Sequence, residues 1–323
     1  MQEKINIGSY TFTVENGVLL RTTGPKDCTD DMILPEGITA VGKEGARTYG
    51  AYPNRVVIPD SVTEVEERGV YYFYKTTEIV FSKNLKRIGK EAFGNLGAET
   101  VDLPASLTEL GEEAFSGSHT KNELRLPTGL KSIPKKAFAN TKISAVLIPD
   151  TVERLEIGCF SLCVNMKNVT FGNGVKQVEK EAFEYCYSLS ALTIPKSVTH
   201  IGEHAFAFCK NLKEIIFEGT DFVLGAEIFN GIVGEIRITY PGTREQIEAI
   251  LNADCFITEY DRDSYYGEPV WSETRRYAAV LGRYGEDAGN FTCTVHCLAD
   301  NTTKTYSCCG RGPAVGRPSF FSM

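Results

Sequence analysis

Two groups of residues in this sequence combine types and spacings that could bind a metal ion. The first is the stretch 200–204, which reads His-Ile-Gly-Glu-His. In zinc proteases the pattern His-x-x-Glu-His presents two metal ligands and a general base from one face of a helix. Here glycine stands at its centre, and the corresponding stretches 87–91 and 109–113 have charged residues in place of both histidines. We therefore interpret the pattern as a coincidence of variable positions.

The second group lies near the C-terminus and comprises Cys293, His296, Cys297, Cys308 and Cys309. Two cysteines separated by three residues and followed by an adjacent pair do not form a recognised zinc spacing. A disulfide from Cys297 to Cys308 or Cys309 is an alternative, and free thiols are another. The sequence contains no Walker-type phosphate loop, and its 4 histidines suggest no catalytic triad. We expect no enzyme activity, no bound metal and no cofactor.

A third set of cysteines indicates the architecture, because Cys163, Cys186 and Cys209 are spaced 23 residues apart. Steps of 22 or 23 residues also separate the apolar residues that open successive repeats, at Ile58, Phe81, Leu103, Leu126, Ile148, Phe171, Ile194 and Phe217. Twelve residues after an opening comes a second marker, at Phe93, Phe115, Phe138, Phe160, Phe183, Phe206 and Phe229. Two markers in one register indicate a tandem repeat.

Each repeat predicts one coil of a solenoid. An alternating stretch such as Leu124-Arg125-Leu126 predicts a short strand, and the proline that often follows the opening residue ends it. One coil cannot bury its own apolar face, so neighbouring coils must stack. The predicted fold is a β-rich solenoid of short parallel strands with irregular or short helical returns. Its core is a column of phenylalanines beside a column of buried thiols; disulfides between these thiols are the alternative, although parallel side chains seldom reach the required dihedral angle.

The stretch 194–209, Ile-Pro-Lys-Ser-Val-Thr-His-Ile-Gly-Glu-His-Ala-Phe-Ala-Phe-Cys, resembles the BspA-type, or treponemal-type, leucine-rich repeat. The resemblance covers residues 54–219. A hairpin-like stretch at 12–19 and a degenerate repeat at 34–41 predict an N-terminal cap over residues 1–53. A strand-then-helix pattern at 237–250 predicts a C-terminal capping repeat over residues 220–262. Residues 263–323 are expected to form an irregular tail with a strand near 291–297.

The resemblance implies binding rather than catalysis. Its members are expected to be bacterial cell-surface or secreted proteins that recognise host matrix proteins, other cells or glycans. The chain itself begins without the apolar core of a signal peptide, and no apolar run approaches the length of a membrane span. The net charge of −8 disfavours nucleic acid as a ligand. A passive spacer within a larger surface protein is the alternative function.

Strand alternation predicts which side chains would contact a ligand. One outward row is expected to comprise Val57, Val80, Asp102, Arg125, Leu147, Thr170, Thr193 and Ile216. Four of these residues are aliphatic, and Asp102 and Arg125 on adjacent coils are placed to pair. The row is predicted to form part of a protein-binding strip, with burial under neighbouring side chains or a second copy of the chain as the alternative.

Overall fold

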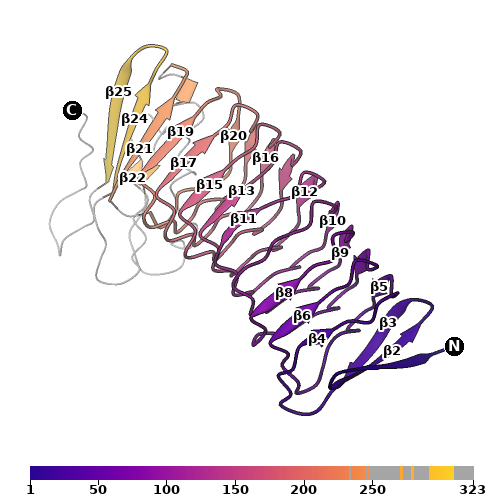
Figure 1. Ribbon diagram of the computed structural model, residues 1–323. Coiled ribbons are helices and arrows are strands. Elements are labelled where there is room, and N and C mark those ends of the chain that lie inside the picture. Colours follow the sequence, from indigo (N-terminus) through magenta and orange to yellow (C-terminus); the bar gives the residue numbers. More distant parts are fainter. Residues whose placement is uncertain (233, 244–245, 248–269, 272–277, 280–290, 309–323) are drawn as a thin grey trace.

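The protein is a stack of coils that runs from the N-terminus to the C-terminus (Figure 1). This computed structural model describes residues 1–232, 234–243, 246–247, 270–271, 278–279 and 291–308. Within these ranges, no helix is both long enough and apolar enough to cross a membrane. The repeat solenoid predicted from the sequence is confirmed.

One side of the stack is built from the strands that end near the opening residues, and we call it the strand face. The strands of this face form three separate sheets, in which parallel pairing joins neighbouring coils; Leu124, for example, lies opposite Val146, which lies opposite Val169. The strands are β4 (Met32–Ile33), β6 (Arg55–Val57) and β8 (Glu78–Val80); β11 (Glu123–Arg125), β13 (Ala145–Leu147) and β15 (Asn168–Thr170); and β17 (Ala191–Ile194), β19 (Glu214–Phe217), β21 (Gly234–Tyr240), β24 (Phe291–Cys297) and β25 (Thr302–Cys308).

A second side consists of two-residue strands that follow the proline turns, preceded by an antiparallel sheet at the N-terminus. Asn16 and Gly17, both at positive φ, connect β2 to β3, as an Asn-Gly hairpin turn requires. The strands are β1 (Glu3–Ile7), β2 (Tyr10–Glu15), β3 (Val18–Thr23), β5 (Ala40–Val41), β7 (Glu64–Val65), β9 (Arg87–Ile88) and β10 (Glu109–Leu110), then β12 (Ser132–Ile133), β14 (Arg154–Leu155), β16 (Gln177–Val178), β18 (His200–Ile201) and β20 (Val223–Leu224); β22 (Val270–Trp271) and β23 (Ala278–Ala279) pair separately.

The third side, which returns each coil to the strand face, is irregular rather than helical. In each coil the backbone takes a positive φ two residues before the repeat phenylalanine and again two residues after it, as at Glu91 (52°) and Asn95 (57°). A continuous α-helix has no place for such residues. The N–H groups are satisfied between coils instead: Phe93 donates to the carbonyl of Ala114 at 2.8 Å, and Phe115 donates to that of Ala137 at 2.8 Å.

The phenylalanines form one interior file, and all seven predicted members are buried. From Phe93 to Phe206 each ring stacks on the next, with centroids 5.2 to 5.6 Å apart and interplanar angles of 5° to 12°. The stacking distance follows from the roughly 4.8 Å spacing of parallel strands together with a small tilt of the rings. The file therefore joins the six coils from Phe93 to Phe206 through continuous ring contacts.

Cys163, Cys186 and Cys209 form a buried column beside the rings, and all three are free. Each thiol donates to the backbone carbonyl of the file phenylalanine in the preceding coil, at 3.2 to 3.3 Å; Cys163, for example, donates to Phe138. These contacts make the thiols part of the packing, in agreement with the interpretation of the column as small buried side chains rather than as disulfides.

Burial gives these thiols a testable chemical property. Desolvation raises the pKa of Cys163 to about 11 and that of Cys209 to about 12, and it raises the pKa of Cys186 as well. Since the thiolate is the reactive form, iodoacetamide at pH 8 is expected to leave all three unmodified in the folded protein and to modify them after denaturation. Mass spectrometry of the peptides measures this, with the partly exposed Cys28 as the internal control. Native labelling of Cys163 as fast as that of Cys28 would contradict the burial.

The same shifts predict how stability depends on pH. Because the folded-state pKa values lie above the ordinary thiol value of 9.0, the unfolded chain loses these protons first as the pH rises. The contribution of the thiols to the free energy of unfolding is therefore fully present below pH 9.0 and is lost as the pH rises toward 11 and 12.

At the C-terminal end, reciprocal hydrogen bonds join Thr243 and Gln246: the Thr243 N–H donates to Gln246 Oε1 at 2.8 Å, and the Gln246 N–H donates to Thr243 Oγ1 at 3.4 Å. This is the capping-box pattern of a helix start. Most of the predicted closing helix, and residues 309–323 of the tail, lie outside the described ranges. Strand β24 occupies the residues where the sequence predicted a tail strand, while the predicted domain boundaries stay predictions.

Candidate functional site

The strand face alternates as expected, with the middle residue of each strand pointing into the core. Val56, Leu124, Val146, Leu192 and Ile215 are buried. Of the predicted outward row, Asp102, Arg125, Leu147, Thr170 and Thr193 are exposed, whereas Val57, Val80 and Ile216 are half-buried. The exposed part of the row therefore lies over the middle coils.

The predicted pairing of Arg125 with Asp102 does not form. Arg125 contacts Glu123 of its own strand, at 3.2 Å. The reason lies in the sheet, which is interrupted here: residues 99–103 form no strand, so β8 and β11 belong to separate sheets. Without strand pairing, Asp102 is not held in register beside Arg125.

The residues of the His-x-x-Glu-His pattern lie on a strand and a turn rather than on a helix. His200 belongs to β18, on the side of the stack opposite the strand face, and residues 203–206 form a turn. His204 Nε2 lies 2.7 Å from Glu227 Oε2 of the next coil. The pattern therefore does not bring two histidines to one helical face.

The register of the C-terminal hairpin separates the cysteines in its two strands. Cys297 lies opposite Thr302, and Cys308 lies opposite Phe291, at the other end of the seven-residue ladder. Six residues of strand span about 20 Å, which is too far for a disulfide between Cys297 and Cys308. The predicted alternative of a Cys297–Cys308 disulfide was therefore wrong. In an antiparallel hairpin the end of the first strand pairs with the start of the second, so Cys297 and Cys308 lie at opposite ends of the ladder. Cys309 lies outside the described residues, and the described residues contain no group of three candidate metal ligands.

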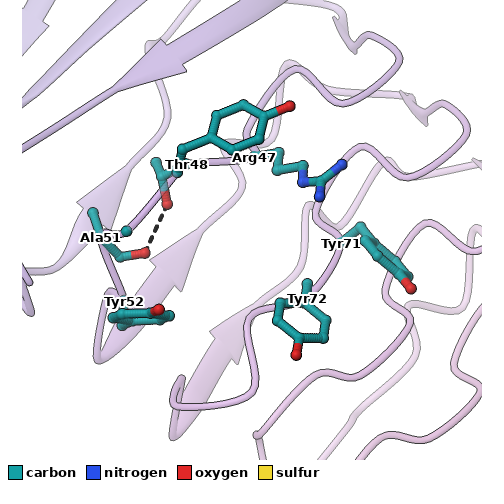
Figure 2. A pocket seen from close by; sticks show the side chains of 8 residues that line it. Arg47, Thr48, Ala51, Tyr52, Tyr71 and Tyr72 are labelled. Carbon is teal, nitrogen blue, oxygen red and sulfur yellow. Dashed lines mark hydrogen bonds between the residues drawn. The ribbon is translucent and has the colours of Figure 1, made fainter. Parts of the chain in front are cut away.

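A hollow of about 200 Å³ lies on the third side of the stack, near the N-terminal end (Figure 2). Most of its wall consists of tyrosine and small residues, and no acidic side chain lines it. The lining residues are Arg47, Thr48, Tyr49, Gly50, Ala51, Tyr52, Tyr71 and Tyr72. Thr48 Oγ1 donates to the Ala51 carbonyl at 2.8 Å and so holds the loop that carries Tyr49.

The rings around the hollow contact one another and three cations, Arg47, Arg68 and Lys75. We call Tyr49, Tyr52, Tyr71, Tyr72 and Tyr74 the first aromatic cluster. The Tyr74 ring makes edge contacts with Tyr52 and Tyr72, with both centroid distances at 5.3 Å. Tyr49 and Tyr72 have exposed fractions of 78% and 53%. Exposed rings with hydroxyl groups at their edges supply large contact area and hydrogen bonds together.

Positive charge accompanies these rings. The Arg47 guanidinium lies 5.0 Å from the Tyr49 ring centroid, and the Lys75 ammonium lies 4.1 Å from that of Tyr52. Arg47 also forms an ion pair with Glu44 at 2.9 Å. A hydrogen bond with Tyr52 raises the pKa of Tyr74.

A second aromatic cluster lies toward the other end of the same side and consists of Tyr185, Tyr187 and Phe208. Tyr185 stacks on Phe208 with centroids 4.6 Å apart, and Tyr187 meets Tyr185 edge-on at 6.0 Å. The Lys210 ammonium lies 5.2 Å from the Tyr187 centroid. Neither cluster was predicted from the sequence. A usable signal was present, since Tyr72 and Tyr74 recur at the same repeat positions as Tyr185 and Tyr187.

The fold defines the class of the protein as a leucine-rich-repeat solenoid. A family model described as BspA type leucine rich repeat region matches residues 49–163 and 131–258, with six copies. The chain belongs to this family, as the resemblance in the sequence predicted.

Solved structures of bacterial leucine-rich repeat proteins are similar to this chain. One from Bacteroides ovatus is 23% identical with a TM-score of 0.58, and the match covers 73% of this chain and 70% of that one. A leucine rich cell surface protein from Faecalibacterium prausnitzii is 18% identical with a TM-score of 0.34, covering 77% and 97%. The pneumococcal vaccine antigen PcpA is 14% identical with a TM-score of 0.40, covering 79% and 91%. No curated protein matches the sequence.

Proposed function

We propose that this chain is a non-catalytic recognition module of a bacterial cell-surface or secreted protein, and that it binds protein or glycan ligands of host or neighbouring cells. The observation that carries the proposal is the exposure of side chains in fixed register along a rigid stack. Coil-to-coil pairing holds Arg125, Leu147 and Thr170 on three adjacent strands. A ligand that contacts this surface meets groups whose positions are already set, so that binding costs little conformational entropy.

The composition of the strand face supports recognition through the outward row. Leu147 has an exposed fraction of 39%, although its neighbours across the strands are polar. The Arg125 side chain is 76% exposed despite its ion pair with Glu123. Arginine is enriched among the residues that contribute most to the affinity of protein interfaces, and Leu147 adds apolar contact area beside Arg125.

The double variant Arg125→Glu, Leu147→Glu tests this row. Saturable binding to immobilised matrix proteins, measured by surface plasmon resonance, is expected to weaken at least about 10-fold, because both a cation and an apolar contact are replaced by negative charge. The matched control is Gln177→Glu in β16, an exposed strand residue on another side of the stack. Unchanged affinity with an intact circular dichroism spectrum would remove the row from the binding surface. Absence of binding by the isolated chain, together with flanking domains that do bind, would favour the spacer.

A further inference from the structure

We infer that the third side of the stack binds an extended acidic polysaccharide of low charge density, held at both ends by the two aromatic clusters. The inference rests on the proposed recognition function and names a ligand class and a second surface for it. We call this surface the return edge. In each coil it comprises the residues two to five positions after the repeat phenylalanine. The first coil has Ala46 and the second has Val70 in place of the phenylalanine, and the last coil included is that of Phe206.

The return edge carries no acidic residue. In a chain with 42 acidic residues and a net charge of −8, these positions contain neither Asp nor Glu in any coil from 48–51 to 208–211. They do contain Lys75, His119, Lys142 and Lys210, and all four are exposed. The carboxylates gather on the adjoining side, where coil-to-coil pairs such as Arg68 with Glu91 at 2.7 Å use them. The return edge thus favours an anionic ligand on an acidic protein.

The two aromatic clusters occupy equivalent positions on this edge. Tyr72 and Tyr185 both stand two residues after the repeat phenylalanine position, and Tyr74 and Tyr187 stand four residues after it. Each cluster has a lysine above a tyrosine ring, and neither Lys75 nor Lys210 forms an ion pair within the described part of the chain. The arrangement provides two binding points, each with aromatic rings, hydroxyl groups and a cation; the rings of the second cluster are half-buried, whereas Tyr49 and Tyr72 of the first are exposed.

These aromatic residues stand where the backbone favours other residue types. Tyr72, Tyr185 and Phe208 have φ values of 69°, 60° and 58°, a region in which asparagine and glycine are preferred. Asn95, Gly117, Asn140 and Leu162 occupy the same position in the four intervening coils, and all have positive φ. A large side chain here costs conformational energy, and such strain is concentrated at functional sites. The backbone path is the same with any of these residues, so the fold does not require aromatic side chains at Tyr72 and Tyr185.

The distance between the clusters requires a long ligand. The coils of Tyr72 and Tyr185 are five steps apart, which is roughly 25 Å along the axis. Between them the edge exposes His119, Lys142 and Leu162, and no tyrosine, phenylalanine or tryptophan stands at these positions of the intervening coils. A polymer with a regular repeat can present the same chemical groups to both aromatic clusters. Once one part of the polymer is bound at one cluster, the effective concentration of the rest of the polymer at the other cluster rises.

The backbone of the return edge favours a polysaccharide over a peptide. Extended peptides commonly bind by adding a strand to unpaired N–H and C=O groups. Here the Tyr72 N–H donates to the Gly94 carbonyl at 2.9 Å, and the Tyr185 N–H donates to the Ala207 carbonyl at 2.9 Å. Recognition must therefore use side chains. Tyrosine rings and hydroxyl groups match the apolar faces and hydroxyl groups of sugars, and the lysines match carboxylates.

Charge density distinguishes this ligand from nucleic acid. Four basic residues are spread over the six coil steps from Lys75 to Lys210, which is roughly 30 Å. A nucleic-acid strand carries one charge about every 3.4 Å. The sparse basic residues fit a polysaccharide of alternating uronate and uncharged sugars, in which every second sugar bears a carboxylate.

Fluorescence polarisation with labelled hyaluronan fragments tests the inference on the whole chain. Fragments longer than the spacing between the clusters are expected to bind at least about 100-fold tighter than fragments that reach only one cluster. Two variants remove the clusters with residues that other coils carry at the same positions: Tyr72→Asn with Lys75→Ala, and Tyr185→Asn with Lys210→Val. Either variant should reduce the affinity of the long fragment to that of the short one.

The control variant is Lys86→Ala, which removes an exposed lysine from outside the return edge and should leave hyaluronan affinity unchanged. Dextran, polyglutamate and a single-stranded oligonucleotide serve as neutral, peptide and nucleic-acid comparators. Tighter binding of any comparator, no gain with fragment length, or no hyaluronan binding would overturn the inference. If hyaluronan does not bind but matrix proteins bind in a manner that depends on Arg125 and Leu147 and not on Tyr72, the polysaccharide inference fails and the proposed function is retained.

Discussion

Replacement of Phe138 by alanine is expected to lower the free energy of unfolding by about 3–5 kcal/mol. The Phe138 ring is 2% exposed and stacks on Phe115 and Phe160, with centroids 5.4 and 5.5 Å away. Removing it leaves a cavity that neither neighbour can fill, because their rings are held by the register of their own coils. Chemical denaturation followed by circular dichroism measures the loss.

The conservative variant Phe138→Leu provides the matched control and should cost less than half as much, since it retains most of the buried volume. Because each coil contacts only its neighbours, the alanine variant should also weaken the coupling between the two halves of the stack and broaden the unfolding transition. A loss below about 1 kcal/mol for the alanine variant would mean that the phenylalanine file contributes little to stability.

The second large effect is expected at Gly174, where alanine should destabilise the protein by about 3 kcal/mol. A Cβ atom at this position would lie 1.8 Å from the Asp150 carbonyl oxygen of the preceding coil. Neither partner is the flexible end of a side chain, so the two coils would have to separate locally. Thermal unfolding monitored by calorimetry would report the change.

Gly37 is the control for this substitution, since it occupies the same repeat position in the degenerate N-terminal repeat. A Cβ atom there meets nothing within 4 Å, but its φ of +84° disfavours alanine. Gly37→Ala should therefore cost only about 1 kcal/mol of backbone strain. An equal loss of stability in the two variants would show that the close approach of neighbouring coils is not the reason why position 174 requires glycine.

The solenoid and its core were predictable because inward residues face the same neighbours in every coil. Phe115, Phe138 and Phe160 recur at a fixed interval for a physical reason, which is that each must pack on the next. The form of the third side was less accessible: positive φ values at residues such as Glu91 and Lys136 leave no consistent residue type in the sequence. They are maintained by hydrogen bonds between coils, which a pattern of side chains does not reveal.

The candidate site was predictable only in part, for a related reason. Alternation correctly placed Arg125 and Leu147 on the outside, but pairing with Asp102 depended on an unbroken sheet, which residues 99–103 interrupt. The aromatic clusters lie at positions that vary from coil to coil. Tyr72 and Tyr185 became a candidate site only when the coils placed them on one side of the molecule with Lys75 and Lys210.

The hydrogen bonds between coils on the third side also bear on how such a protein could diversify. Because main-chain groups make these bonds, the path of the chain is the same whether asparagine, glycine, leucine or tyrosine stands at the position of Asn140, Gly117, Leu162 or Tyr185. Substituting those side chains would change the chemistry of the outer surface and leave the packing of the core unchanged. Chains of the same shape could therefore acquire different ligand preferences through a handful of substitutions, each at a modest cost in stability.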